Sequence, residues 1–252
     1  LVLRAGSDDV GRREGILAVL SAPITAGATL TDADVTVVPD PSFSLESAVV
    51  DAADINGDGA QDLVVGTGLN RGSDAIWVFE GPLSGTLTGE DTIAQMVGVN
   101  GIGVGGSVAW LGDVDGDAVE DLLVGAPYDT AGGYSAGAAF LVLGPIEGEI
   151  DVRDQIKLEG ESGDSTGLGY HGYAGKTVAG PGDVDGDGFD DLLIGSETDP
   201  SGGELYEGTA YLLRGPVTVS MSLEDADMRF RGPERTRGGA GVHESFLAVA
   251  QV

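Results

Sequence analysis

The sequence contains no cysteine, and lysine and arginine together account for only 12 of its 252 residues, against 42 aspartates and glutamates. The absence of cysteine excludes disulfides, thiol nucleophiles and zinc–thiolate sites. The formal net charge of −30 argues against nucleic acid as a partner, because phosphates would be repelled. Every apolar run is shorter than the roughly 18 residues of a membrane-spanning helix, so this stretch is predicted to contain no membrane span.

Aromatic residues are also few, at 6% of the chain, whereas glycine is abundant, with 44 residues. Charged residues make up 21%, so the composition is neither that of a disordered acidic tail nor that of a coiled coil. Short runs of Val, Leu and Ile bounded by Gly, Pro, Asp and Ser predict β-strands. No segment of helical length carries an apolar stripe with a helical period. We therefore predict an all-β fold.

One nine-residue pattern recurs along the chain. Residues 183–191 read DVDGDGFDD, and residues 113–121 (DVDGDAVED) and 54–62 (DINGDGAQD) repeat the pattern, each followed by an apolar run. Oxygen ligands at alternate positions, with glycines that allow a sharp turn, are what a hard cation such as Ca²⁺ needs. The sequence therefore predicts about three calcium sites.

The predicted ligands are the side chains at positions one, three, five and nine of each loop, together with the backbone carbonyl of position seven. They are Asp54, Asn56, Asp58, Ala60 and Asp62 in the first loop, Asp113, Asp115, Asp117, Val119 and Asp121 in the second, and Asp183, Asp185, Asp187, Phe189 and Asp191 in the third.

These loops have two other interpretations. An EF-hand needs a glutamate at position twelve, where this chain has Val65, Val124 and Ile194, so a calcium site in a hairpin loop is favoured. The loops could also be solvated turns, because aspartate and glycine favour turns without any ion. Against that interpretation, several carboxylates within nine residues repel one another strongly unless a cation is bound.

The three loops are not expected to bind calcium equally. Asn56 lowers the negative charge of the first loop. Ala118 replaces the glycine found at Gly59 and Gly188, which costs about 1 kcal/mol if that position needs a positive φ. We therefore expect the third loop to bind most tightly. The role would be structural, because binding free energy adds to folding free energy.

The acidic loops recur at intervals of about 59 and 70 residues, a period typical of propeller blades. Each unit is predicted to contain four strands, with the acidic loop between the first and second. The predicted units are a partial blade at residues 1–46, whole blades at 47–105, 106–174 and 175–244, and the first strand of a following blade at 245–252. Continuous apolar runs suit strands that are covered on both faces, as in stacked blades.

Residues 105–127 (GGSVAWLGDVDGDAVEDLLVGAP) resemble an FG-GAP repeat, the unit of the β-propeller at the head of integrin α chains and of many bacterial surface proteins. Residues 125–127 supply the GAP, whereas Val104–Gly105 and Ala174–Gly175 stand where Phe–Gly would be. The resemblance implies a β-propeller of four-stranded antiparallel blades, of which this chain holds about four blade-equivalents. The family usually closes a ring of seven blades, so the chain is expected to be a fragment of such a ring or a rarer small propeller.

The resemblance also implies where a partner would bind. In integrin heads the connections between second and third strands and between blades share one face, opposite the calcium loops, and that face meets ligands. Tyrosines in these connections could stack on sugars or anchor a protein partner, or they could simply cover the loops. The tyrosines of this possible ligand face are Tyr128, Tyr134, Tyr170, Tyr173 and Tyr206.

Two short motifs match enzyme signatures in the wrong context. The GxSxG at residues 133–137 would need a helix after it to act as a nucleophile elbow, and a strand is predicted there instead. The GxGxxG at residues 101–106 also leads into a predicted strand, which offers no helix N-terminus to a nucleotide. His171 and His243 occupy similar repeat positions, which favours loop packing. No catalytic residue and no cofactor other than calcium is predicted.

The leading hypothesis is a calcium-binding, non-enzymatic adhesion or ligand-binding module that is secreted or lies at the cell surface. Its partner would be an extracellular protein or a glycan. Two alternatives remain open. The chain could be the accessory propeller of a secreted hydrolase or lyase whose catalytic domain lies elsewhere, or it could be a carbohydrate-binding lectin.

Overall fold

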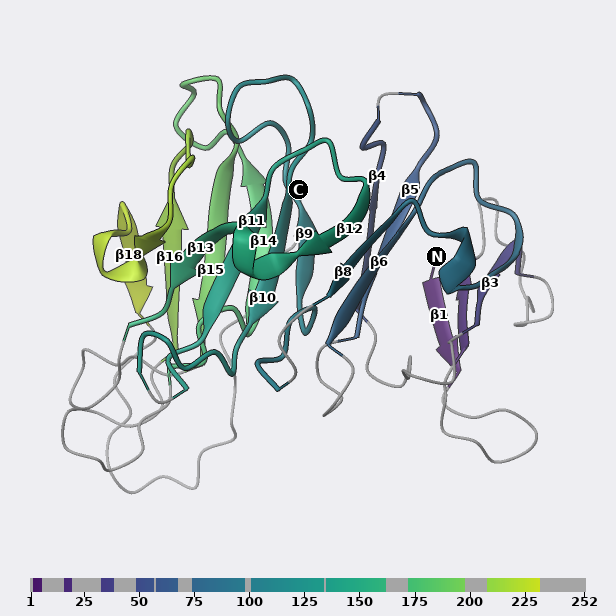
Figure 1. Ribbon diagram of the computed structural model, residues 1–252. Helices are drawn as coiled ribbons and strands as arrows, with labels where there is room; N and C mark the ends of the chain where they lie inside the picture. The colour runs from purple at the N-terminus through teal and green to yellow at the C-terminus, as the bar shows by residue number, and fades with distance from the viewer. Residues whose placement is uncertain are drawn as a thin grey trace.

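The computed structural model describes residues 2–5, 16–19, 33–38, 49–56, 58–67, 74–97, 101–133, 135–161, 172–197 and 208–231. Within these residues the chain forms β-strands and short 3₁₀ helices, and no α-helix, which confirms the predicted all-β class. The strands form four sheets in the described residues, and Figure 1 shows these sheets standing side by side.

The main strands of each sheet pair antiparallel in chain order, as the repeat predicts. The first sheet contains β1 (Val2–Ala5), β2 (Ile16–Val19) and β3 (Val35–Val37), and the second contains β4 (Val49–Ala53), β5 (Asp62–Gly66), β6 (Ala75–Phe79) and β8 (Ala94–Val97). The third contains β9 (Val108–Trp110), β10 (Leu122–Ala126), β11 (Ala138–Val142) and β13 (Ile156–Glu159), and the fourth contains β14 (Thr177–Gly182), β15 (Asp191–Ser196), β16 (Thr209–Leu213) and β18 (Met228–Arg231). The exact borders between units stay predictions.

Three further strands occur in addition to the four predicted for each unit. They are β7 (Gly85–Leu87), β12 (Gly148–Asp151) and β17 (Met221–Ser222). Each lies between the third and fourth main strands of one unit and pairs in parallel with the outer strand of the preceding sheet, namely β3, β8 or β13. These strands tie each sheet to the one before it.

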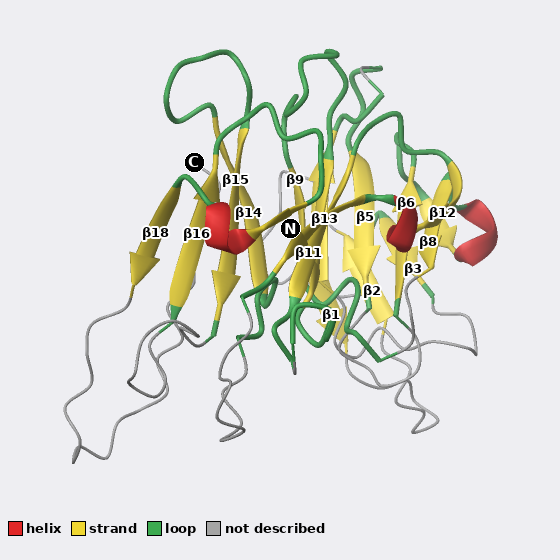
Figure 2. Ribbon diagram, turned by 60° about the vertical axis from the view of Figure 1, so that its left-hand side comes forward, coloured by secondary structure: helices red, strands yellow, loops and turns green. Residues whose placement is uncertain are grey.

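A short 3₁₀ helix follows each of these added strands and leads the chain back to its own sheet. The helices are η2 (Gly89–Asp91), η3 (Val152–Asp154) and η4 (Leu223–Asp225), drawn in red in Figure 2. Each begins at a residue whose side chain caps it, namely Thr88, Asp151 or Ser222, because an oxygen of that side chain accepts a backbone N–H of the first turn.

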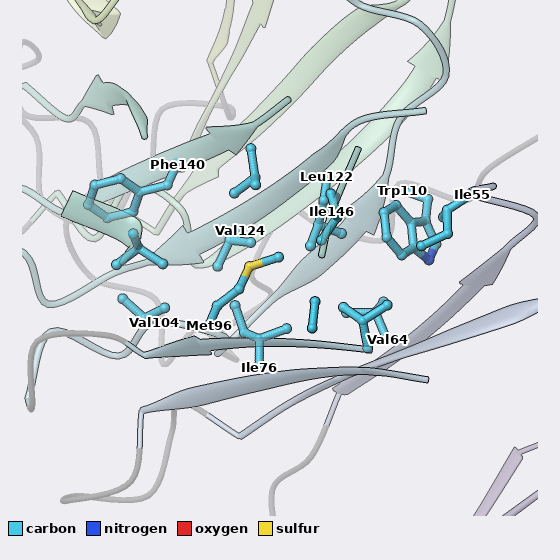
Figure 3. Close-up of a cluster of buried hydrophobic side chains, with 14 of the residues drawn as sticks. Ile55, Val64, Ile76, Met96, Val104, Trp110, Leu122, Val124, Phe140 and Ile146 are labelled. Carbon is cyan, nitrogen blue, oxygen red and sulfur yellow. The ribbon is translucent and has the colours of Figure 1, made fainter. Parts of the chain in front are cut away.

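The apolar core lies between neighbouring sheets. Strands β5 and β10 are buried along their whole length, as their continuous apolar runs predict. One cluster joins the second sheet to the third, with Ile76 and Met96 on one side and Leu122 on the other (Figure 3). Two similar clusters join the first sheet to the second and the third to the fourth. The main strands of the second and third sheets thus pack on both faces.

Sheets of four and five strands that stack face to face are the arrangement of β-propeller blades. In the described part of the chain they do not close into a ring, since the first and fourth sheets lie at opposite ends of the row (Figure 1). None of the helices in these ranges is long and apolar enough to cross a membrane.

Candidate metal sites and the opposite edge

The three acidic loops lie at one edge of the stacked sheets. They connect β4 to β5, β9 to β10 and β14 to β15, and Figure 1 shows these connections along its upper edge. Each loop joins the first and second strands of a unit, so the sheet repeat itself brings the three loops to the same edge.

The carboxylates at positions one, three and five converge in the second and third loops. In each group, one ligand atom from every member lies within 4.8 Å of the others; the groups are Asp113, Asp115 and Asp117, and Asp183, Asp185 and Asp187. The first loop has Asn56 at position three, so only two carboxylates, of Asp54 and Asp58, stand at these positions. Oxygen donors in this arrangement fit Ca²⁺, whose coordination by carboxylates and carbonyls is flexible.

The same hydrogen bonds fix the backbone of all three loops. The carboxylate at position one accepts the N–H groups of positions five and six. The side-chain oxygen at position three accepts the N–H of position five, and the carboxylate at position five accepts the N–H of position seven. In the third loop these N–H donors, above all that of Gly188, lower the pKa of Asp183, which keeps this carboxylate ionised.

The backbone at position seven is where the sequence predicts a carbonyl ligand. Ala60, Val119 and Phe189 are half-buried there, and their N–H groups are those that position five accepts. Coordination through their carbonyl oxygens stays a prediction.

Position nine is placed differently from the other acidic positions. Asp62, Asp121 and Asp191 have no exposed surface. One carboxylate oxygen of each accepts the N–H of loop position two, at 2.8 to 2.9 Å. The other oxygen accepts the N–H of a glycine that follows the third strand, namely Gly81, Gly144 or Gly215, at 2.6 to 3.0 Å.

The aspartate at position nine thus joins the acidic loop to the Gly–Pro turn that follows the C-terminal end of β6, β11 or β16. Burial raises the pKa of Asp121 to about 6, although the N–H groups of Gly144 and Val114 act in the opposite direction. The structure therefore gives position nine a structural role within the loop, and its coordination of a cation stays a prediction.

Position six has a positive φ in all three loops. This is the condition under which Ala118 was predicted to cost more than glycine. The φ angle is 87° at Gly59, 67° at Ala118 and 96° at Gly188. Alanine in this left-handed region costs about 1 kcal/mol relative to glycine. The second loop therefore carries a strain that the other two lack.

The second and third loops contact one another. Asp190 of the third loop accepts the N–H of Asp113 at 2.9 Å, and its own N–H donates to the Asp113 carbonyl at 3.0 Å. Burial raises the pKa of Glu120 in the second loop, and the nearby carboxylates of Asp54 and Asp190 raise it further. Negative charge thus accumulates along this edge, which favours the binding of cations.

Glu80 and Arg214 lie beside the loops and were not predicted as site residues. Glu80 Oε1 accepts a hydrogen bond from Asn56 Nδ2 of the first loop at 2.7 Å. Arg214 Nη1 donates to Asp185 Oδ2 at 2.9 Å in the third loop, and its Nη2 donates to Asp227 Oδ1 at 3.1 Å. Both residues directly precede a Gly–Pro pair, and this shared position is the signal by which the sequence could have revealed them.

Two of the predicted ligand-face tyrosines meet at the opposite edge. The rings of Tyr128 and Tyr173 are 5.8 Å apart and lie edge to face at 89°. Lys176 Nζ lies 6.0 Å from the centre of the Tyr128 ring, and Tyr128 is 37% exposed. The remaining tyrosines of this set lie outside the described residues, namely Tyr134, Tyr170 and Tyr206.

The two enzyme-like motifs lie in loops that precede strands. The GxSxG around Ser135 leads into β11, and the GxGxxG that ends at Gly106 leads into β9. Neither motif is followed by a helix, as a nucleophile elbow or a dinucleotide loop requires. His171 and His243 lie outside the described residues.

Comparison with known proteins agrees with the repeat. The family model for the FG-GAP repeat matches residues 177–213, which span β14 to β16 and include the third acidic loop. Integrin alpha-PS5 of Drosophila melanogaster is 36% identical over 189 residues, which cover 73% of this chain and 17% of that protein. Integrin alpha-V of Gallus gallus is 35% identical over 153 residues, and integrin alpha-5 of Xenopus laevis is 32% identical over 154 residues; each match covers 58% of this chain and 14% of the relative. The chain thus spans 14–17% of the length of these curated relatives.

Proposed function

The chain is an integrin-like FG-GAP repeat protein, and on this basis we propose that it is a calcium-stabilised binding module that acts in adhesion outside the cell. The observation that carries the calcium proposal is the convergence of three carboxylates in each of two loops whose backbone hydrogen bonds are the same. The first loop repeats these hydrogen bonds, which supports a third site.

Calcium at these loops would act on stability rather than on chemistry. The side chains at positions one, three and five would hold the ion, and the ion would supply positive charge where carboxylates crowd together. A cation that binds the folded chain and not the unfolded chain stabilises it by about 2.7 kcal/mol when its concentration is a hundred times the Kd. Calcium is millimolar outside cells, so sites without a closing glutamate would be filled there.

Calcium stoichiometry tests this proposal directly. We expect equilibrium dialysis to find about three bound ions per chain in the unchanged protein. The double variant Asp183→Asn, Asp185→Asn is expected to lose one ion, whereas Glu149→Gln, which changes an exposed acidic residue on β12, is expected to lose none. A chain that binds no calcium, or loop and control variants that bind equally, would contradict the assignment of the loops as sites.

The ligand face of this module is proposed to include Tyr128 and Tyr173. Their edge-to-face pair presents a partly exposed aromatic ring beside the Lys176 ammonium group, a combination that suits a protein or glycan partner. We expect Tyr128→Ala to lower binding to arrays of extracellular-matrix proteins and glycans. Phe230→Ala, which removes another exposed ring on β18, serves as the control. Equal binding by both variants would remove the tyrosine pair from the ligand face.

A further inference from the structure

We infer that the residue directly before each Gly–Pro turn sets the cation affinity of the neighbouring acidic loop, with Glu80 strengthening the first loop and Arg214 weakening the third. The inference rests on the proposed calcium function. It concerns two residues that lie outside the loop sequences and reach them through the fold.

The buried aspartate at position nine holds these residues beside the loops. Its carboxylate accepts the N–H of Gly81, Gly144 or Gly215, so the Gly–Pro turn is fixed to the loop in all three units that carry an acidic loop. The residue before that glycine therefore occupies the same place in each unit. The three residues are Glu80, Leu143 and Arg214, which carry a negative charge, no charge and a positive charge.

In the third loop the guanidinium group of Arg214 already pairs with a candidate ligand. It donates to Asp185 Oδ2 at 2.9 Å and to Asp227 Oδ1 at 3.1 Å, and the Arg214 backbone N–H donates to Asp227 Oδ2 at 2.9 Å. Asp227 thus fixes Arg214 from both its backbone and its side chain. A calcium ion that uses Asp185 must compete with this built-in cation, which also removes one unit of negative charge from the site.

In the first loop position three lacks a carboxylate, because it is Asn56, and Glu80 supplies one nearby. Asn56 Oδ1 accepts the Asp58 N–H at 3.0 Å, as the position-three aspartates do in the other loops. Its other terminal atom, Nδ2, is a donor that cannot bind a cation, and it contacts Glu80 Oε1 at 2.7 Å. Glu80 therefore returns to the first loop the carboxylate that position three lacks.

Asp54, Asn56 and Glu80 line one cavity of about 760 Å³, together with Ala118 and Glu120 of the second loop and the turn between β11 and β12. Glu80 and two of the predicted ligands of the first loop thus share one space. Leu143 has no charge, so the second loop is the neutral reference. When positions one, three and five are counted together with the residue before the Gly–Pro pair, the third loop carries less negative charge than the other two. The third loop is then no longer expected to bind calcium most tightly.

Site-specific calcium titration by amide NMR tests the inference on the whole chain. The Gly59 and Gly188 amides, which donate to Asp54 and Asp183, report separately on the first and third loops. We expect Arg214→Leu to tighten calcium binding at the third loop roughly three- to tenfold, and Glu80→Leu to weaken the first loop by a similar factor. The exchange variants Arg214→Gln and Glu80→Gln, which keep a polar side chain, should shift affinity in the same directions.

Arg153→Leu is the matched control, because Arg153 is an exposed arginine that pairs with Asp151 on β12 rather than with an acidic loop. Unchanged affinity at the third loop in both Arg214 variants, or an equal gain in Arg153→Leu, would overturn the inference while leaving calcium binding intact. If the amide signals of the unchanged chain do not shift when calcium is added, the proposed function itself is contradicted.

Discussion

The second and third acidic loops have the same hydrogen-bonded backbone and the same three converging carboxylates, yet their surroundings differ. The second loop has Ala118 at position six and the neutral Leu143 beside it, whereas the third has Gly188 and Arg214. The comparison shows that positions one, three, five and nine determine the shape of a loop. The differences in strain and charge between these two loops come from other residues, which vary without changing that shape.

The two loops also differ in what covers them. A methyl group at Gly116 of the second loop would lie 2.6 Å from the Phe189 ring of the third loop, whereas one at the equivalent Gly186 would meet nothing within 4 Å. The third loop thus packs on the second through Phe189. A change in one of these two sites is therefore expected to be felt by the other.

The largest effect is expected where the two loops are most alike. Replacing Asp121 or Asp191 with alanine leaves one buried and one partly buried N–H group without an acceptor, which costs about 3 kcal/mol of unfolding free energy. This loss should be similar in both loops and should persist in excess chelator, as measured by urea denaturation. Asp115→Ala is the control, with little cost in chelator. A loss confined to calcium-containing buffer would show that position nine acts as a ligand and not as a backbone acceptor.

A smaller effect should separate the loops by their covering. Alanine at Gly116 or Gly186 costs about 1 kcal/mol for a positive φ, and at Gly116 the contact with Phe189 adds roughly 2 kcal/mol. Gly116→Ala is therefore expected to be the more destabilising variant in chemical denaturation. Equal costs for the two variants would mean that the loops do not pack against each other in solution.

The smallest effect should remove the difference at position six. Ala118→Gly is expected to stabilise the chain by about 1 kcal/mol, and Gly188→Ala to destabilise it by about the same amount, because both residues have positive φ. A built methyl group at Gly188 meets no atom within 4 Å, so the cost there is conformational alone. Matched thermal melts of the two variants check the sign. Destabilisation by Ala118→Gly would contradict the strain assigned to the second loop.

The sequence was sufficient to predict the strands and the acidic loops because both depend on local patterns. The apolar runs of β5, β10 and β15 and the alternate carboxylates before them carry their own signal. The added strands β7, β12 and β17 were not predicted, because each is only two to four residues long and pairs with the preceding sheet. Their one local signal is the capping Thr, Asp or Ser before each 3₁₀ helix.

The site was predicted less completely than the fold. Glu80 lies 24 residues from Asn56, and Arg214 lies 29 residues from Asp185, so only the closed hairpin brings each pair together. The buried position of Asp121 was also hidden, because an aspartate that accepts two backbone N–H groups has the same spacing as one that ligates a metal. Local patterns revealed which residues form the loops, and the tertiary structure revealed their partners.

Thermal unfolding in a few millimolar calcium, in magnesium and in excess chelator shows whether calcium stabilises the acidic loops. We expect a large rise in melting temperature that is specific to calcium and that shrinks when Asp115 and Asp185 are replaced with alanine. Identical melting in calcium and in chelator would contradict it, and would mean that the acidic loops are turns stabilised by their backbone hydrogen bonds alone.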